Sequence, residues 1–335
     1  MATIKDVAKA AGVSVATVSR VLNASENVRP ETVEAVKRAI SELDYHPNFL
    51  GRTLRRLETM KILVMVPTIS NQFYSRVIRG IQSVARQNGY HVMLGITESD
   101  PDAEQEYVEM ARRKLVDGVI FLYSSLPAKE ITELAQSCPA VFANECVPGA
   151  EVSAVSIDNR QAGYDAAEFL IRNGHRTIAF VSAGMLYGSS SERREGFCAA
   201  MLDAGLSADE KLFIDEGLTF KAGRRAATRL LQGKLPDAVF AASDSAAIGL
   251  ISSLEEKGIR VGKDISVMGF DDNQIAEYFI PALTTVSQPQ IEIGQKAMEL
   301  LIEKMHDLTG EAKQIVLPHR LEIRNSVRLT TVTPV

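Results

Sequence analysis

The sequence predicts two architectures in one chain: an N-terminal headpiece of three helices with a helix-turn-helix, and a larger α/β core of two lobes with parallel sheets. The headpiece is indicated by helical periodicity in residues 3–45, interrupted by a glycine turn. The core is indicated by apolar strands that alternate with amphipathic helices from Lys61 onward, in two successive series. A basic segment joins the two parts.

The first two predicted helices flank Gly12. Residues 4–11 place apolar side chains at i, i+3, i+4 and i+7, which gives the first helix one apolar face. Gly12 then supplies the permissive backbone that a tight turn needs. Ser14 is a suitable N-cap for a second helix over residues 15–22. We expect this helix to bury Val18, Val21 and Leu22 and to expose Val15, Ala16, Ser19 and Arg20.

A third helix is predicted from Pro30, which suits a first helical turn, with Pro47 beyond its end. Two helices joined by a glycine turn match the helix-turn-helix, whose second helix enters the DNA major groove. Spacing alone also fits an ordinary helical hairpin. The apolar face of the third helix is expected to consist of Val33, Val36, Ile40 and Leu43.

The connecting residues 46–57 contain no acidic residue and could form a short basic amphipathic helix. Gly51 disfavours this helix by roughly 1 kcal/mol relative to alanine. We therefore expect the segment to fold only on DNA. Its basic residues are Arg52, Arg55 and Arg56, and its apolar ones include Leu50 and Leu54.

Several motifs follow one another in a specific order: Thr-Ile-Lys-Asp-Val-Ala, Gly-Val-Ser, Thr-Val-Ser-Arg-Val-Leu-Asn, Tyr-His-Pro-Asn and Arg-Thr-Leu-Arg-Arg. This order resembles the headpiece and hinge of the lac repressor family of bacterial regulators, and the resemblance continues to about Arg328. It implies a hinge helix in the minor groove that inserts Leu54 between base pairs; the alternative is a linker residue packed on the core. The expected DNA-binding residues are Thr3, Ser14, Val15, Ala16, Thr17, Ser19, Arg20, Asn23, Arg52, Leu54 and Arg55.

From Lys61 the pattern is strand, turn, helix, repeated. The run Ile62–Val66 is continuously apolar, as in strands of buried parallel sheets. Further strands are expected at 90–96, 118–122, 140–143, 154–157, 177–182, 213–215, 238–241, 266–270 and 314–317. Helices are expected at 73–88, 102–114, 131–137, 161–173, 193–204, 222–231, 245–257 and 290–305.

Ligands of open α/β sheets bind beyond the carboxyl ends of the strands, so the loops after strands should form a site. The family resemblance implies a periplasmic-binding-protein-like core with an effector in the cleft between its lobes. It also matches Arg193 and Asp271 to the family's cleft arginine and aspartate. The expected effector-binding residues are Phe73, Tyr74, Asn144, Ser189, Arg193, Leu218, Phe220, Asp244 and Asp271.

Most of these candidates also have a structural interpretation. The aromatic pair, Phe73 and Tyr74, could stack on a ring or staple its own helix. Arg193 or Asp271 could form a structural ion pair or a helix cap. Asn144 and Asp244 are weaker candidates, because Asn and Asp favour turns in any case.

Charge is distributed unevenly along the chain. Residues 1–60 hold nine Lys and Arg against seven Asp and Glu, a net charge of +2, which leaves −7 for the remainder of a chain whose total is −5. DNA contact should therefore be confined to the N-terminal part. The isolated Cys138, Cys146 and Cys198 indicate free thiols in a reducing cytoplasm. No signal peptide or membrane span is expected.

The sequence offers little support for an enzyme. It contains no P-loop, G-x-G-x-x-G, H-E-x-x-H or G-x-S-x-G motif. His91 and His175 are interpreted as surface or cap residues, and Asp158 with Asp271 would form a glycosidase-like pair without any supporting motif. A periplasmic sugar-binding protein would share the core but carry a signal peptide and no headpiece. We therefore expect no enzymatic activity, cofactor or metal.

The resulting prediction is a cytoplasmic transcriptional regulator, expected to be a repressor. Residues 1–45 should read DNA, 46–60 form a hinge, and 61–335 bind an effector and dimerise. The expected partners are a near-palindromic double-stranded operator, a small-molecule effector and a second copy of the chain. Residues 143–145, 156–159 and 218–223 resemble the nucleoside-responsive members of the family, so a nucleoside or nucleobase is the first choice and a sugar or sugar phosphate the alternative.

Overall fold

The computed structural model describes residues 2–22, 28–45, 58–184, 188–207 and 209–330. The chain divides into two compact units, residues 1–58 and 59–335. The first is helical, and the second, called the core below, contains two six-stranded sheets.

The helical unit contains α1 (Ile4–Ala10), α2 (Val15–Leu22) and α3 (Pro30–Glu42). Thr3 and Asp6 form a reciprocal capping box on α1, and the backbone N–H of Thr17 donates to Ser14 Oγ at 3.1 Å at the start of α2. Gly12 has a φ of +67° in the turn between them. The predicted helix-turn-helix is thereby confirmed.

The apolar interior of the helical unit differs from the prediction near the C-terminal end of α3. Helix α3 stops at Glu42, so Leu43 is an exposed C-cap residue rather than part of the apolar face. Tyr45 is buried in its place, because the backbone turns back after the helix and the Tyr45 N–H donates to the Ile40 carbonyl. Among the residues described in this unit, the buried apolar cluster consists of Val7, Ala8, Val18, Val36, Ala39 and Tyr45.

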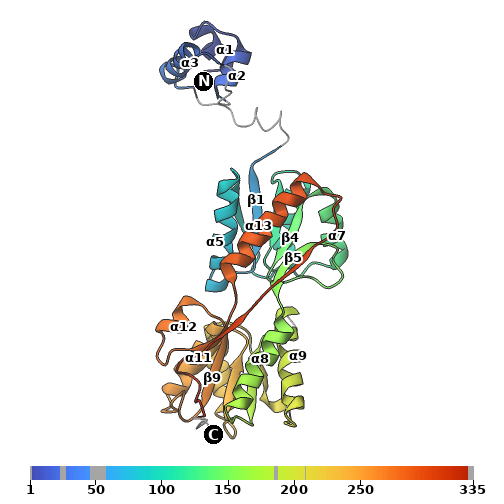
Figure 1. Cartoon of the computed structure of the whole chain (residues 1–335), viewed down its shortest axis with the longest axis vertical. Helices are drawn as coiled ribbons and strands as arrows, with labels where there is room; N and C mark the ends of the chain where they lie inside the picture. The colour runs from blue at the N-terminus through green and yellow to red at the C-terminus, as the bar shows by residue number, and fades with distance from the viewer. Residues whose placement is uncertain (1, 23–27, 46–57, 185–187, 208, 331–335) are drawn as a thin grey trace, which may run out of the picture. The chain divides into compact units, whose positions relative to one another are not determined.

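Lobe one of the core contains a parallel sheet in the order β11-β5-β4-β3-β1-β2. Its strands are β1 (Lys61–Val66), β2 (His91–Ile96), β3 (Gly118–Phe121), β4 (Ala140–Ala143), β5 (Ser153–Ile157) and β11 (Gln314–Leu317). Its helices are α5 (Gln72–Gln87), α6 (Pro101–Arg112), α7 (Ala128–Ser137) and α13 (Gln290–His306). Figure 1 labels β1, β4 and β5 of this sheet and the helices α5, α7 and α13 of the same lobe.

Lobe two contains the second sheet, in the order β12-β10-β9-β8-β6-β7, with only β12 antiparallel to its neighbour among these pairings. Its strands are β6 (Ile178–Ser182), β7 (Phe213–Asp215), β8 (Ala238–Ala241), β9 (Ser266–Asp271), β10 (Thr284–Ser287) and β12 (Arg320–Glu322). Its helices are α8 (Asn159–Arg172), α9 (Gly188–Asp203), α10 (Phe220–Leu230), α11 (Asp244–Glu255) and α12 (Gln274–Tyr278), with a short 3-10 helix, Glu210–Leu212.

The chain passes between the lobes three times, after β5, after β10 and after β11. This arrangement confirms the predicted two-lobed α/β core with parallel sheets. The strands β10 and β12 and helix α12 were not predicted, and α9 begins at Gly188 rather than Arg193. Arg193 therefore lies inside a helix, not at the end of a loop.

His175 is not a surface residue, because it is fully buried. Its Nδ1 lies 2.8 Å from the Leu170 carbonyl at the end of α8, and its Nε2 lies 2.7 Å from Ser266 Oγ on β9. His175 therefore caps the end of α8, which was the second of the two roles predicted for it. Burial lowers the pKa of His175, which favours the neutral imidazole.

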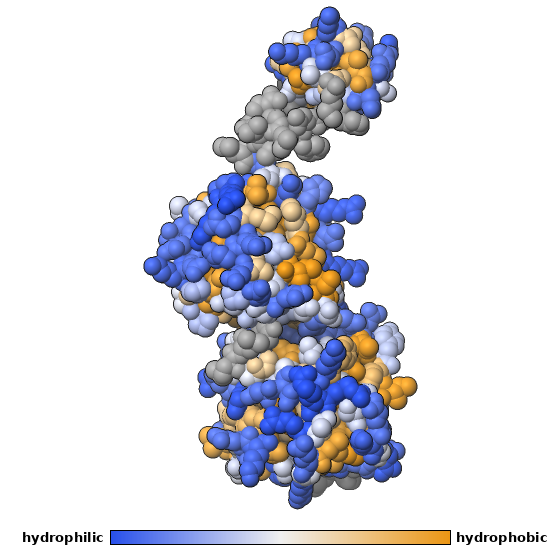
Figure 2. Space-filling view, turned by 180° about the vertical axis from the view of Figure 1, so that it is seen from behind, coloured by the Kyte–Doolittle hydropathy of each residue, from blue (hydrophilic) through white to orange (hydrophobic). Residues whose placement is uncertain are grey.

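The core surface shown in Figure 2 is mostly hydrophilic, with separate apolar patches on both lobes. Within the described part of the chain, no helix is both long and apolar enough to cross a membrane.

Three helix pairs are packed backbone to backbone through glycines. A Cβ at Gly163 of α8 would overlap the Arg193 carbonyl of α9, and one at Gly196 of α9 would overlap the Arg160 carbonyl of α8. The other pairs are α5 with α13, through Gly80 and Gly294, and α10 with α11, through Gly223 and Gly249. Only glycine permits these separations.

We expect Gly196→Ala to lower the free energy of unfolding of the core by about 1–3 kcal/mol, because the new methyl group forces α8 and α9 apart. Alanine's better helix propensity, worth about 1 kcal/mol, offsets only part of this loss. Urea denaturation measures the effect. Gly233→Ala is the matched control, since open space surrounds that position; equal stabilities of the two variants would contradict the overlap.

Candidate DNA-reading surface and ligand cleft

The predicted DNA-reading face of α2 is accessible. Val15, Ala16 and Arg20 are exposed, and Ser19 is half-buried. Ser14 and Thr17 lie at the start of the same helix, where their hydroxyl oxygens are 2.9 Å apart, while Thr3 caps α1. The remaining candidates, Asn23, Arg52, Leu54 and Arg55, lie outside the described residues.

In the core, one cavity gathers residues that follow strands of both sheets, as the loop argument predicted. Its volume is about 30 Å³, whereas small-molecule pockets usually measure roughly 300–1,000 Å³. A ring-sized ligand therefore does not fit the cavity in the arrangement seen here. The lining residues are Asn71, Phe73, Tyr74, Asn144, Glu145, Ser189, Arg193, Leu218, Ala242, Ser243, Asp271 and Gln288.

Arg193 is held rigidly in the wall of this cavity. Its Nε donates to Asn159 Oδ1 at 2.9 Å and its Nη1 donates to the Ala242 carbonyl at 2.8 Å. The guanidinium carbon lies 3.6 Å from the ring centroid of Phe270, a cation–π contact. Burial lowers the pKa of Arg193, and the nearby carboxylates of Asp271 and Glu145 oppose that effect.

Asp271 ends β9 in a backbone conformation that is rare for a non-glycine residue, with a φ of 115°. Gln288 Nε2 donates to its Oδ1 at 2.8 Å, and Gln290 Nε2 donates to its backbone carbonyl. Burial raises the pKa of Asp271 to about 7, against the opposing charge of Arg193. Asn144, which follows β4 in lobe one, also has a positive φ, 88°. Such strain is frequent at binding sites.

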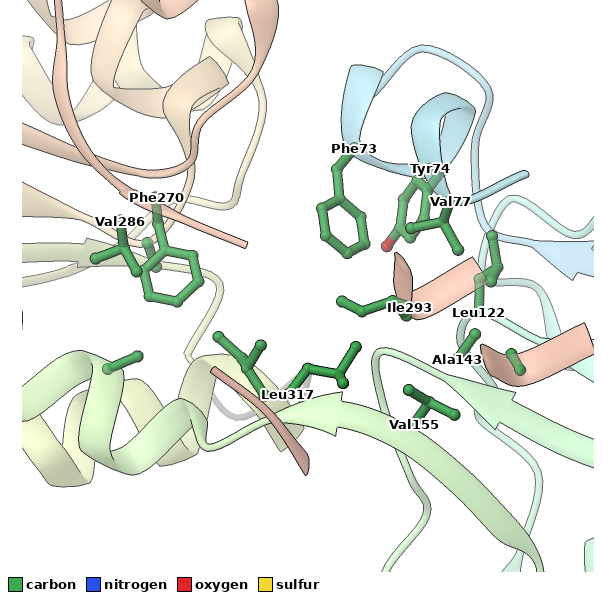
Figure 3. Packing of buried hydrophobic residues seen from close by; sticks show 14 of the residues in the cluster. Phe73, Tyr74, Val77, Leu122, Ala143, Val155, Phe270, Val286, Ile293 and Leu317 are labelled. Atoms are coloured by element: carbon green, nitrogen blue, oxygen red, sulfur yellow. The ribbon is translucent and has the colours of Figure 1, made fainter. Parts of the chain in front are cut away.

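Phe73 and Tyr74 begin α5 and contact each other edge to face, with ring centroids 5.5 Å apart. Both side chains line the cavity, and both are largely buried. In Figure 3 they lie on the opposite side from Phe270 and Val286 of lobe two. They therefore provide apolar surface to the cavity and also belong to the apolar cluster of the core, so the two interpretations of this pair are compatible.

Glu145 joins the two lobes. It follows Asn144 in lobe one, and its Oε1 accepts the backbone N–H of Ser189, the second residue of α9 in lobe two, at 2.7 Å. Burial raises the pKa of Glu145, while the hydrogen bond from Ser189 and the charge of Arg193 oppose the shift.

Two candidates do not line the cavity. Asp244 is fully buried behind it, where the Asn273 N–H donates to its Oδ2 and Thr285 Oγ1 to its Oδ1, both at 2.6 Å. Burial, with repulsion from Asp271, raises the pKa of Asp244 well above its usual value. Phe220 begins α10, where its side chain is 43% exposed. The backbone of Phe220, rather than its ring, has a structural role, because the Phe220 carbonyl packs against Gly249 of α11.

Five lining residues were not singled out from the sequence: Asn71, Glu145, Ala242, Ser243 and Gln288. The first four lie in loops after predicted strands, so the loop rule could have found them. Gln288 follows β10, a four-residue strand that was not predicted, so the loop rule could not point to it. Among the described residues, no group of three His, Cys, Asp or Glu could hold a metal ion.

The raised pKa of Asp271 predicts a pH-dependent stability. Between pH values of about 4 and 7 the folded core holds a proton that the unfolded chain has lost, so this stabilisation is present at low pH and disappears as pH rises through about 7. From pH 5 to pH 8, we expect the free energy of unfolding to fall by up to about 3 kcal/mol more in the wild type than in Asp271→Asn. Urea denaturation at each pH tests this; parallel profiles would show that Asp271 stays charged.

Comparison with known proteins identifies the family. Residues 3–48 match the model for bacterial regulatory proteins of the lacI family, and residues 167–327 match the periplasmic binding protein-like domain. The HTH-type transcriptional repressor CytR of Escherichia coli is 36% identical over 329 residues, which cover 98% of this chain and 96% of that protein.

Two solved structures share the fold. The lac repressor dimer bound to operator and the anti-inducer ONPF has a TM-score of 0.87 and 26% identity, over 98% of this chain and 99% of that one. The complex of the transcriptional regulator CelR with cellobiose has a TM-score of 0.73 and 33% identity, over 97% of this chain and 100% of that one. The chain therefore belongs to the lacI family of bacterial regulatory proteins, which are DNA-binding transcriptional regulators with a ligand-binding core.

Proposed function

We propose that this regulator is a repressor whose operator affinity is set by a small molecule bound in the cleft between the lobes. The observation that carries the proposal is the shared cavity, in which Phe73 and Tyr74 of lobe one meet Arg193 and Asp271 of lobe two. A ligand that bridges these groups contacts both lobes at once, and a contact that differs between two arrangements of the lobes couples the ligand to the conformation. In this scheme residues 1–45 read DNA, 46–60 form the hinge, and 61–335 bind effector and dimerise.

Our first choice of effector is a nucleoside or nucleobase. The edge-to-face pair of Phe73 and Tyr74 supplies aromatic surface for a base, while Arg193 and Asp271 supply polar groups for hydroxyls. The resemblance of residues 143–145, 156–159 and 218–223 to nucleoside-responsive members of the family also supports this choice. The position of Phe220 outside the cavity removes one argument for it. A sugar is the second candidate, supported by similarity to the regulator solved with cellobiose.

We further propose that the protein acts as a homodimer on a near-palindromic site in the cytoplasm, where bacterial operators lie. The similar lac repressor was solved as a dimer on its operator. Apolar side chains for such an interface are exposed on both lobes of this chain. They include Leu94 and Ile96 on the edge strand β2 and Tyr278 and Ile280 after β9.

Calorimetry on the full chain with a panel of nucleosides, nucleobases, free sugars and sugar phosphates tests the effector class. We expect a nucleoside or nucleobase to bind, and binding to be lost in Asp271→Ala, because the cleft loses its central acceptor. The variant must still melt in one cooperative transition above the assay temperature, so that the loss of binding is not caused by unfolding. Heat from a sugar alone would favour the second candidate, and unaltered ligand binding in Asp271→Ala would place the site elsewhere.

Arg20 is the residue of α2 that we expect to read guanine, through O6 and N7, with Val15 and Ala16 beside it. On an operator selected by the wild type from random DNA, Arg20→Ala should lose roughly 1–3 kcal/mol and relax the preference at one position. Lys37→Ala serves as the control, because Lys37 is an exposed, positively charged residue on α3. Uniform weakening on all sequences would make Arg20 a phosphate contact instead.

A further inference from the structure

The carboxylate of Glu145 occupies a place that suits an anion. Helix α9 spans sixteen residues, Gly188–Asp203, and its first backbone N–H groups point out of the helix start. Helix starts of this kind attract phosphates and carboxylates. Here Glu145 Oε1 accepts the N–H of Ser189 at 2.7 Å, and both residues line the cavity. The protein thus supplies its own anion where a ligand's phosphate would otherwise bind.

The same cavity contains acceptors that lack donors. Gln288 Oε1 and Asn144 Oδ1 are buried in residues only 5% and 7% exposed, and neither has a hydrogen-bond partner among the described residues. When Asp271 is a carboxylate, the orientation of Gln288 is fixed, because its Nε2 donates to Asp271 Oδ1 and a flipped amide would set two oxygens against each other. Buried acceptors of this kind require a donor, which a bound ligand can provide.

Several donors of the cavity are already engaged within the protein. Arg193 donates through Nε to Asn159 and through Nη1 to Ala242. Ser243 Oγ donates to the Leu218 carbonyl and accepts the Ala246 N–H. Besides donors on Asn71, Asn144 and Ser189, the described lining therefore presents the carboxylates of Glu145 and Asp271 and two amide oxygens without a partner. Arg193 is the one cation among these described residues. This set matches a ligand that donates hydrogen bonds and carries no negative charge.

We propose that Glu145 determines effector specificity: it makes the cleft select uncharged, hydroxyl- or amino-bearing effectors and reject their phosphorylated forms. This inference rests on the proposed role of the cleft as the effector site. The competing interpretation is that Glu145 only clamps the lobes together. The specificity role depends on the negative charge of Glu145, whereas the clamp role depends only on its hydrogen bond to Ser189.

The substitution Glu145→Gln removes the negative charge but keeps the hydrogen bond between the lobes, because the amide oxygen can still accept the Ser189 N–H. Inorganic phosphate is the probe, titrated into the full-length protein by calorimetry at pH 8. We expect Glu145→Gln to bind phosphate roughly tenfold or more tightly than the wild type, because one close negative charge has been removed. The matched control is Glu151→Gln, which removes the same charge from an exposed position in the same connection between β4 and β5.

Equal phosphate affinity in the wild type, Glu145→Gln and Glu151→Gln would overturn the proposal, as would wild-type protein that binds cytidine 5′-monophosphate more tightly than cytidine. A gain in Glu145→Gln alone supports it. This comparison does not depend on the natural effector. If no compound of the neutral panel binds the wild type, the proposed effector class fails, while the phosphate titrations still decide the role of Glu145.

Discussion

The geometry of the cleft depends on the direct backbone contact between α8 and α9. Gly163 and Gly196 let the two helices touch without side chains between them. The carbonyl of Arg193 lies where a side chain of Gly163 would be, so this contact fixes the position from which the Arg193 side chain extends. Asn159 at the start of α8, the Ala242 carbonyl and the Phe270 ring then hold its guanidinium. A larger residue at either glycine would move the arginine together with the helix.

A second glycine-mediated helix contact supports the part of the cleft that lobe one provides. Helices α5 and α13 touch through Gly80 and Gly294. The start of α5 carries Phe73 and Tyr74, and the start of α13 carries Gln290, which binds the Asp271 carbonyl. Because α13 follows directly after the second crossing between the lobes, the aromatic wall and the support of Asp271 are connected through one rigid helix pair. Interfaces of this kind are stiff, since close-packed backbones leave no side-chain rotamers to adjust.

Local patterns predicted most of the fold. The three headpiece helices followed from periodicity, Gly12 and Ser14, because these signals act within a few residues. Polar side chains after apolar strands pointed to the cleft, and family resemblance added Arg193 and Asp271. What escaped depends on contacts distant in sequence. The loop after β4 contains Glu145, but its role depends on Ser189, which lies far along the chain. Gln288 follows β10, whose pairing with β9 was not predicted.

The three crossings between the lobes have a consequence for the order of events during synthesis. Lobe one lacks β11 until residue 317 has been made, and lobe two lacks β12 until residue 322, so neither sheet is complete before the chain is almost finished. The helical unit, in contrast, has Tyr45 as the last buried residue among those that the structure describes. At roughly 5–20 residues per second, it precedes a finished core by about 15–55 seconds. During that time a nascent chain can contain a folded helical unit while the core, which would bind the proposed effector, is still incomplete.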